Sequence, residues 1–274
     1  MGISGWRYAG WRGDFYPTGL AQRRELEYAA SLLTSIEVNG SFYSLQRASS
    51  YAAWRDATPA DFVFAVKGGR FITHMKKLVD VDGPLANFFA SGVLALGDKL
   101  GPVLWQLPET LGFDRLRLAD FFARLPRTTA EAAVLARRHD SRVKDPVLEA
   151  PVDRPIRHAL EFRSSSFLVP ETTELLARHD VACVLADTAG RWPKVDADTS
   201  DFRYVRLHGD RELYASGYGP EALDRWASAC TSWAQTGEDV FVYFDNDAKG
   251  FAPHDARGLI DRLRERAGQR HPGR

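Results

Sequence analysis

Short apolar runs and helical patterns alternate along almost the whole chain, and this rhythm restricts the fold more than any other feature. The apolar runs have the length of buried strands and lie at residues 2–5, 35–39, 62–67, 102–106, 157–162, 181–187, 204–208 and 240–245. Strands that alternate with helices form a parallel sheet with right-handed crossovers. Eight such strands in 274 residues favour an α/β chain folded as a closed (β/α)8 TIM-type barrel. No Gly-x-Gly-x-x-Gly follows the first run, which disfavours a dinucleotide-binding sheet.

The helical patterns fill most gaps between these runs and predict one domain. They cover residues 23–33, 49–57, 84–100, 116–125, 171–179, 220–236 and 255–267. We therefore predict a single barrel domain over residues 1–266 and a polar C-terminal tail over 267–274.

Two segments depart from the regular rhythm. A helical pattern at 128–140, followed by a connector to residue 154, stands before the fifth strand. Because it follows the fourth helix, we expect this 128–154 insertion at the end of the barrel opposite the catalytic end. Residues 188–200 form a polar stretch where a helix is expected, so we predict a loop there.

Composition and charge narrow the class of protein. Lys+Arg and Asp+Glu both number 36, so the zero formal charge provides no general attraction to nucleic acid. Cys183 and Cys230 make neither a disulfide framework nor a zinc motif, as is typical of a reduced intracellular protein. No apolar run approaches the roughly 20 residues that span a bilayer, and no signal-peptide pattern is visible. We expect a cytoplasmic protein that does not contact a membrane.

The second predicted strand indicates where a polar pocket lies. Ile36 and Val38 share one face of this strand, so Glu37 and Asn39 share the other. A carboxylate and an amide on an inner face are costly to bury unless they are paired or hydrated. This strand is therefore expected to direct them into a polar pocket.

Polar residues end all eight predicted strands, whereas the strand bodies are apolar. In a (β/α)8 barrel the reactive groups lie at these carboxyl ends. We predict catalytic roles for Glu37 and Glu161 as an acid–base pair and for His208 as a proton shuttle. The predicted ligand-binding residues are Asn39, Tyr43, Lys67, His74, Gln106, Asp187, Arg206, Tyr243 and Asn246.

The expected partner is a small polar or anionic ligand, such as a sugar or sugar phosphate. Aromatic side chains are numerous at the same end of the barrel, as is usual where sugars or bases stack. Lys67 and Arg206 would hold a carboxylate, a phosphate or a developing oxyanion. The structural alternative is an ion-pair network that satisfies itself and fills the barrel.

Two other functions fit the same residues. Glu37, Glu161, Asp187 and His208 have the ligand types of a divalent metal site, as in a metal-dependent isomerase or endonuclease-like barrel. The cations Lys67 and Arg206 would repel such an ion, so no metal is assigned and the cofactor is unknown.

The second alternative is a non-catalytic protein that binds nucleic acid or a phosphorylated ligand. The basic residues for it are Arg70, His74, Lys76 and Lys77. Phosphate contacts would make such binding fall steeply with salt, and the zero net charge disfavours nucleic acid.

Several ordered motifs resemble the YecE-like proteins, or domain of unknown function 72. They are Ser4-Gly5-Trp6, Glu37-Val38-Asn39, Ser41-Phe42-Tyr43, Lys67 with Phe71-Ile72-Thr73-His74, Gly97-Asp98-Lys99-Leu100-Gly101-Pro102, Gln106-Leu107-Pro108, Glu161-Phe162-Arg163, Arg206-Leu207-His208-Gly209 and Tyr243-Phe244-Asp245-Asn246-Asp247. The resemblance extends from residue 2 to about residue 259. It implies a single-domain TIM-type barrel. It implies no particular activity, because the family has no settled biochemical function.

The chain departs from the motifs of this family at the fifth and eighth strands. Where relatives often read Glu-x-Arg-His-x-Ser-Trp, this chain has Ser164 and Phe167, so no histidine-dependent step is expected there. Asp245 stands where relatives often carry Asn. The chain also begins almost on its first predicted strand, so we expect a slightly truncated start.

Overall fold

Within residues 1–269, which the computed structural model describes, parallel strands pair in chain order and close into a barrel. Strand β1 pairs with β2 on one side and with β8 on the other. The strands are β1 (Gly2–Ser4), β2 (Ser35–Val38), β3 (Val63–Lys67), β4 (Leu100–Gln106), β5 (His158–Glu161), β6 (Val181–Asp187), β7 (Phe202–Leu207) and β8 (Asp239–Phe244). The prediction of a (β/α)8 barrel is confirmed.

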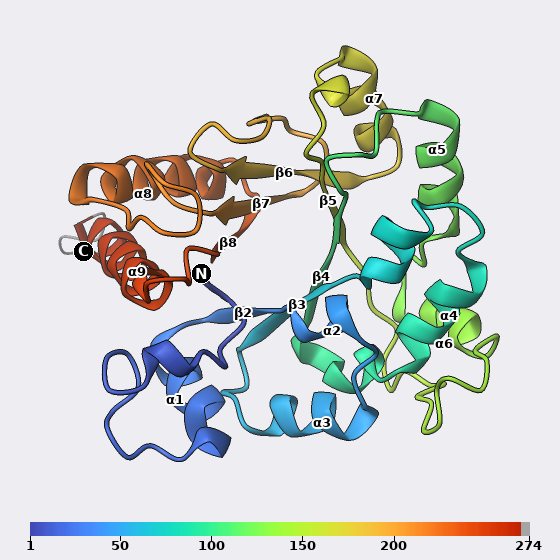
Figure 1. Cartoon of the computed structure of the whole chain (residues 1–274), viewed down its shortest axis with the longest axis horizontal. Coiled ribbons are helices and arrows are strands. Elements are labelled where there is room, and N and C mark those ends of the chain that lie inside the picture. The colour runs from blue at the N-terminus through green and yellow to red at the C-terminus, as the bar shows by residue number, and fades with distance from the viewer. Residues whose placement is uncertain (270–274) are drawn as a thin grey trace, which may run out of the picture.

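Helices surround the barrel on its outer side (Figure 1). They are α1 (Glu25–Leu32), α2 (Gly40–Tyr43), α3 (Ala48–Asp56), α4 (Asp82–Ala90), α5 (Arg115–Arg124), α6 (Thr129–Ala136), α7 (Pro170–Arg178), α8 (Pro220–Gln235) and α9 (Phe251–Gln269). Short 3-10 segments lie at Ala9–Trp11, Gln22–Arg24, Val93–Lys99 and Ser165–Phe167, and a π-helical turn at Phe71–Met75. None of the helices among the described residues has both the length and the apolar character to cross a membrane.

Alternation along the strands places two layers of side chains inside the barrel. The lower layer is apolar or aromatic and includes Ala65, Leu104, Ala159, Tyr204 and Tyr243, all buried. Side chains two residues apart on a strand point to the same face. The upper inward layer therefore falls on residues two positions further along, which are Lys67, Gln106, Glu161, Arg206 and Asp245. The apolar layer closes the barrel beneath this polar one.

The predicted helix at 84–100 is wrong, because the structure divides it into α4 and the 3-10 segment Val93–Lys99. The break falls at Gly92, whose φ is 130° and whose added Cβ would lie 2.5 Å from Ala48 Cα. Only glycine adopts such a φ readily, and the close approach lets the segment pack against α3. The last predicted helix, 255–267, is also too short, since α9 begins at Phe251.

The insertion before β5 forms α6, which Thr128 caps by accepting a hydrogen bond from Glu131 N. Helix α6 packs against α4. Residues 188–201, all within the described part of the chain, form a loop without a helix, as predicted. Of the predicted tail, residues 267–269 continue α9, and residues 270–274 lie outside the described residues.

Candidate functional site

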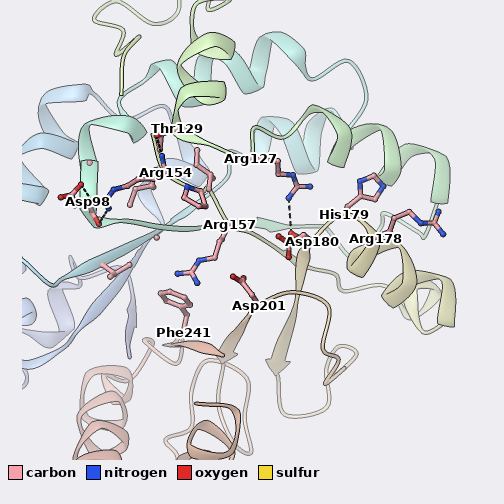
Figure 2. Close-up of a pocket in the computed structure, with 16 residues that line it drawn as sticks. Asp98, Arg127, Thr129, Arg154, Arg157, Arg178, His179, Asp180, Asp201 and Phe241 are labelled. Atoms are coloured by element: carbon pink, nitrogen blue, oxygen red, sulfur yellow. Dashed lines mark hydrogen bonds and ion pairs between the residues drawn. The ribbon is translucent and has the colours of Figure 1, made fainter. Parts of the chain in front are cut away.

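Two cavities of similar size lie at opposite ends of the barrel. One, of about 850 Å³, is lined by residues near the starts of the strands and by the α6 insertion (Figure 2). Three of its four arginines already have partners among the described residues, Arg178 being the exception: Arg154 pairs with Asp98 at 2.7 Å, and Arg157 pairs with Asp239 at 2.7 Å. Arg127 donates to the Asp180 carbonyl at 3.2 Å. Because these charges hold the lower end of the barrel together, the candidate site is the other cavity.

The second cavity, of about 830 Å³, opens at the carboxyl ends of the strands, and we call it the mouth cavity. This end carries the active site in TIM-barrel enzymes. Among the predicted site residues, the structure brings Asn39, Tyr43, Lys67, His74 and Gln106 into its lining. They come from β2, β3, β4 and the turns that follow them.

Arg206 is the centre of the charged network beneath this cavity. Its side chain is 0% exposed. Its guanidinium donates to Glu37 Oε1 at 2.9 Å, to Glu161 Oε2 at 2.7 Å and to Asp245 Oδ2 at 3.0 Å. A planar guanidinium with five donors suits such a multiple contact. Arg206 is therefore committed to three carboxylates and does not face the cavity.

Both predicted catalytic glutamates belong to this network. Glu37 also accepts hydrogen bonds from Ser4 Oγ at 3.0 Å and Tyr204 Oη at 2.6 Å. Glu161 accepts a further one from Arg163 Nε at 3.0 Å. Burial alone would raise the pKa of Glu161, but the guanidinium groups of Arg206 and Arg163 hold it well below its usual range. A carboxylate kept ionised in this way is a poor proton donor.

His208, the third predicted catalytic residue, is fully buried and does not line the cavity. Its Nδ1 is 2.9 Å from Asp245 Oδ2, although the ring N–H is not aligned for a hydrogen bond. The Tyr214 ring meets the imidazole edge-on at 5.4 Å between centroids. Asp245 and Tyr214 line the cavity, so both lie between it and His208.

Lys67 is the cation that the network leaves free. It is 8% exposed and lines the cavity, with its ammonium 4.5 Å from the centre of the Phe42 ring. Its ammonium takes part in none of the hydrogen bonds and ion pairs found among residues 1–269. Burial and the nearby Arg206 lower the pKa of Lys67 to about 8, although Glu37, Asp245 and Glu161 oppose this shift.

His74 lies beside Lys67 as a neutral imidazole. Burial, Lys67 and Arg163 lower the pKa of His74 to about 4. Its Nδ1 is 2.8 Å from Thr73 Oγ1, and its Nε2 is 3.5 Å from the Gln106 amide nitrogen. At neutral pH this ring is uncharged, and it can relay a proton by taking it up at one nitrogen and releasing one from the other.

Asn39 contributes an acceptor that has no partner. Its Oδ1 is buried and is not hydrogen-bonded to any described residue. Buried polar atoms are almost always paired with protein, water or ligand. In the cavity lining, this oxygen is placed to accept a hydrogen bond from a bound molecule.

Four predicted ligand contacts require correction. Arg206 is occupied by the carboxylates, and Tyr243 lies in the lower layer, where its hydroxyl is 2.7 Å from Ser35 Oγ. Asp187 is 3.1 Å from Lys194 Nζ, outside the cavity. The fully buried Asn246 donates from Nδ2 to Asp255 at 2.8 Å and so supports the loop after β8. Strand periodicity marked these positions as inward-facing or terminal, but it could not show which partners would occupy them.

The cavity also contains residues that had no predicted ligand role. Arg163 donates to Glu161 and stacks 3.7 Å from the centre of the Trp192 ring. The other lining residues without a predicted ligand role include Tyr8, Phe42, Met75, Tyr214 and the carboxylate Asp247. Arg163 lies two residues after Glu161, so strand alternation was the signal that could have placed it.

The alternative metal site is not assembled. Arg206 fills the space between Glu37 and Glu161, and Asp187 is paired with Lys194. Residues 1–269 contain no group of three or more His, Cys, Asp or Glu side chains that could hold a metal ion. The basic cluster is also divided, because Arg70 and His74 line the cavity but Lys76 and Lys77 do not.

Comparisons with known proteins agree with the barrel. The family model described as "Protein of unknown function DUF72" matches residues 1–273. The UPF0759 protein YunF of Bacillus subtilis (strain 168) is 25% identical over 292 residues, which cover 96% of this chain and 94% of YunF. A DUF72 family crystal structure from Thermotoga maritima MSB8 matches with TM-score 0.76 and 24% identity, over 96% of this chain and 97% of that one. One from Enterococcus faecalis V583 gives 0.72 and 17%, over 96% and 94%.

Proposed function

We propose that this chain, which belongs to the DUF72 family of proteins of unknown function, is an enzyme that binds a small anionic, hydroxyl-bearing ligand and transfers a proton within it. A sugar phosphate is the kind of ligand intended. The observation that carries the proposal is the buried, unpaired ammonium of Lys67 facing the mouth cavity. A buried charge without a partner is costly, and an anionic ligand would supply the missing partner.

The dimensions and polarity of the cavity support a ligand of this class. Its volume of about 830 Å³ lies within the range of roughly 300–1,000 Å³ that is common for small-molecule sites. Arg70 adds a second cation at the rim, and Asn39 offers an unpaired acceptor to a hydroxyl group. Phosphate and hydroxyl groups on one molecule would satisfy all three side chains.

Proton transfer is assigned to the groups that face the ligand. Lys67, with a pKa of about 8, and the neutral His74 both line the cavity. Groups that titrate near the working pH are effective general acids and bases, and Lys67 is such a group. His74 titrates well below neutral pH and is assigned only as an uncharged proton acceptor. Glu37 and Glu161 become positioning residues, since they hold Arg206 and thereby shape the floor of the cavity.

Binding is tested by calorimetry with a panel of pentose and hexose phosphates and the corresponding neutral sugars. At least one phosphate should bind, its neutral sugar should bind much more weakly, and Lys67→Met should weaken phosphate binding at least tenfold. Lys76→Met is the matched control, because this lysine lies in the segment that follows β3 but outside the cavity. Equal binding by Lys67→Met and wild type would overturn the proposal.

Catalysis is tested by incubating the bound sugar phosphate in D₂O and measuring carbon-bound deuterium by mass spectrometry. Exchange should occur with the wild type and fall at least tenfold in His74→Phe, with binding retained. Binding without any exchange would refute the enzymatic part of the proposal and favour a non-catalytic ligand-binding protein.

A further inference from the structure

The environment of Lys67 differs from that of an ordinary buried lysine. Such a lysine normally reaches a carboxylate or extends its ammonium to water. Here the three nearby carboxylates, Glu37, Glu161 and Asp245, are each taken by Arg206. The ammonium instead lies against the face of the Phe42 ring, at the inner wall of the cavity.

This environment makes the amine available as a nucleophile. Burial and the positive charge of Arg206 favour the neutral form, against the opposing effect of the carboxylates of Glu37, Asp245 and Glu161. With a pKa of about 8, roughly a tenth of Lys67 is neutral at pH 7, compared with less than about one in a thousand for an ordinary lysine. Desolvation beside a second cation is a recognised way to activate a lysine for imine formation.

We propose that Lys67 Nζ captures the carbonyl carbon of an anionic aldehyde or ketone as an imine in the mouth cavity. This inference rests on the proposed function, because it requires an anionic ligand at this site, and it specifies the substrate class. When Lys67 is neutral, the anionic group is held by Arg70, which forms no ion pair within the described part of the chain. The carbonyl end then reaches the inner wall, where Lys67 lies beside His74 and Gln106.

The covalent step balances without an oxidant or reductant. The lone pair of neutral Nζ forms the C–N bond while the C=O π bond breaks, and the oxygen takes a proton to give a carbinolamine. Loss of the hydroxyl as water, with the second N–H proton, leaves the C=N bond. A proton taken up from solvent on the imine nitrogen gives the iminium, which withdraws electrons, so the neighbouring C–H bond loses its proton more easily. Neutral His74 is the cavity base for that proton.

The test is reductive trapping on the full chain. The protein is incubated with dihydroxyacetone phosphate or pyruvate, treated with sodium borohydride, and analysed by intact mass and peptide mapping. One reduced adduct at Lys67 is expected with at least one of these probes. It should disappear in Lys67→Arg, which keeps the charge, and in Lys67→Met, and it should persist in Lys76→Met. The rate of trapping should increase with pH, with a midpoint near 8.

Glycerol 3-phosphate separates this inference from the proposed function, because it carries the anion without a carbonyl. It should bind in calorimetry, compete with the carbonyl probe and give no adduct. Binding of glycerol 3-phosphate without any adduct at Lys67, or with equal adducts in Lys67→Arg, overturns the inference and leaves the proposed function standing. Failure of every anionic probe to bind overturns both.

Discussion

Replacing Arg206 with methionine would reveal how far the mouth of the barrel depends on one guanidinium. The side chain is 0% exposed and contacts Glu37, Glu161 and Asp245 at 2.9, 2.7 and 3.0 Å. Methionine replaces the aliphatic part of the arginine side chain but not its guanidinium, so the Arg206→Met variant leaves three carboxylates without their common cation. Breaking a buried ion pair by removing one partner costs about 3–5 kcal/mol.

The structure sets the magnitude near the upper end of that range. Glu161 keeps its contact with Arg163 at 3.0 Å, and Glu37 keeps its hydrogen bonds from Ser4 and Tyr204. Because these two carboxylates keep other partners, the loss of stability is smaller than three times the cost of one broken ion pair. We therefore expect Arg206→Met to reduce the free energy of unfolding by about 5 kcal/mol at pH 7, a large share of the roughly 5–15 kcal/mol of a native protein.

The pH dependence distinguishes a charge effect from a packing effect. In the wild type the pKa of Glu161 is lowered in the folded state, so its stabilisation is present above the unfolded pKa and is lost as pH falls. Without Arg206 the largest opposing charge is lost, so the pKa of Glu161 rises from its wild-type value and the carboxylate is protonated at a higher pH. The stability difference between wild type and variant should therefore shrink as pH falls from 7 to about 4.

Urea unfolding at pH 7 and pH 4 measures both effects. Arg24→Met is the control, because Arg24 pairs with Glu27 on the surface and its loss should not change stability measurably. A loss below about 1 kcal/mol for Arg206→Met at pH 7, or a loss that is the same at both pH values, would refute the electrostatic reasoning.

Three further predictions concern stability. Lys67→Met should raise the free energy of unfolding at pH 7 by up to about 3 kcal/mol, because the folded pKa of about 8 makes the lysine destabilising below that pH. If urea unfolding gave the variant a lower free energy of unfolding than the wild type, this prediction would be contradicted. Burial lowers the pKa of His158 to about 3, so the wild type should lose stability as pH falls from about 6.5 towards 3. His158→Phe should lose less stability over the same pH range. If wild type and variant showed parallel curves of stability against pH, His158 would not be the cause of the decline. Gly92→Ala should cost about 1–3 kcal/mol because its Cβ would lie 2.5 Å from Ala48 Cα at a φ of 130°, whereas Gly83→Ala, with open space around it, should not; equal thermal midpoints would argue against strain.

Periodicity predicted much of the fold, because the direction of a side chain along a strand depends only on local backbone geometry. It placed Glu37, Lys67 and Glu161 inside the barrel, and strand ends near the observed residues. It did not predict the break at Gly92, since the surrounding sequence is apolar and helical. The constraint there is the backbone of α3, which is distant in sequence.

The sequence predicted which residues gather at the candidate site but not which of them form ion pairs with one another. The sequence by itself determined that carboxylates and cations meet at one end of a parallel barrel, because all eight strands point the same way. It could not determine which charges pair. Arg206 reaches from β7 to Glu37 on β2 and to Glu161 on β5, across 169 and 45 residues of sequence. Only closure of the barrel brings these groups within hydrogen-bond distance, and the network that then forms leaves the buried Lys67 without an ion-pair partner among the described residues at the cavity.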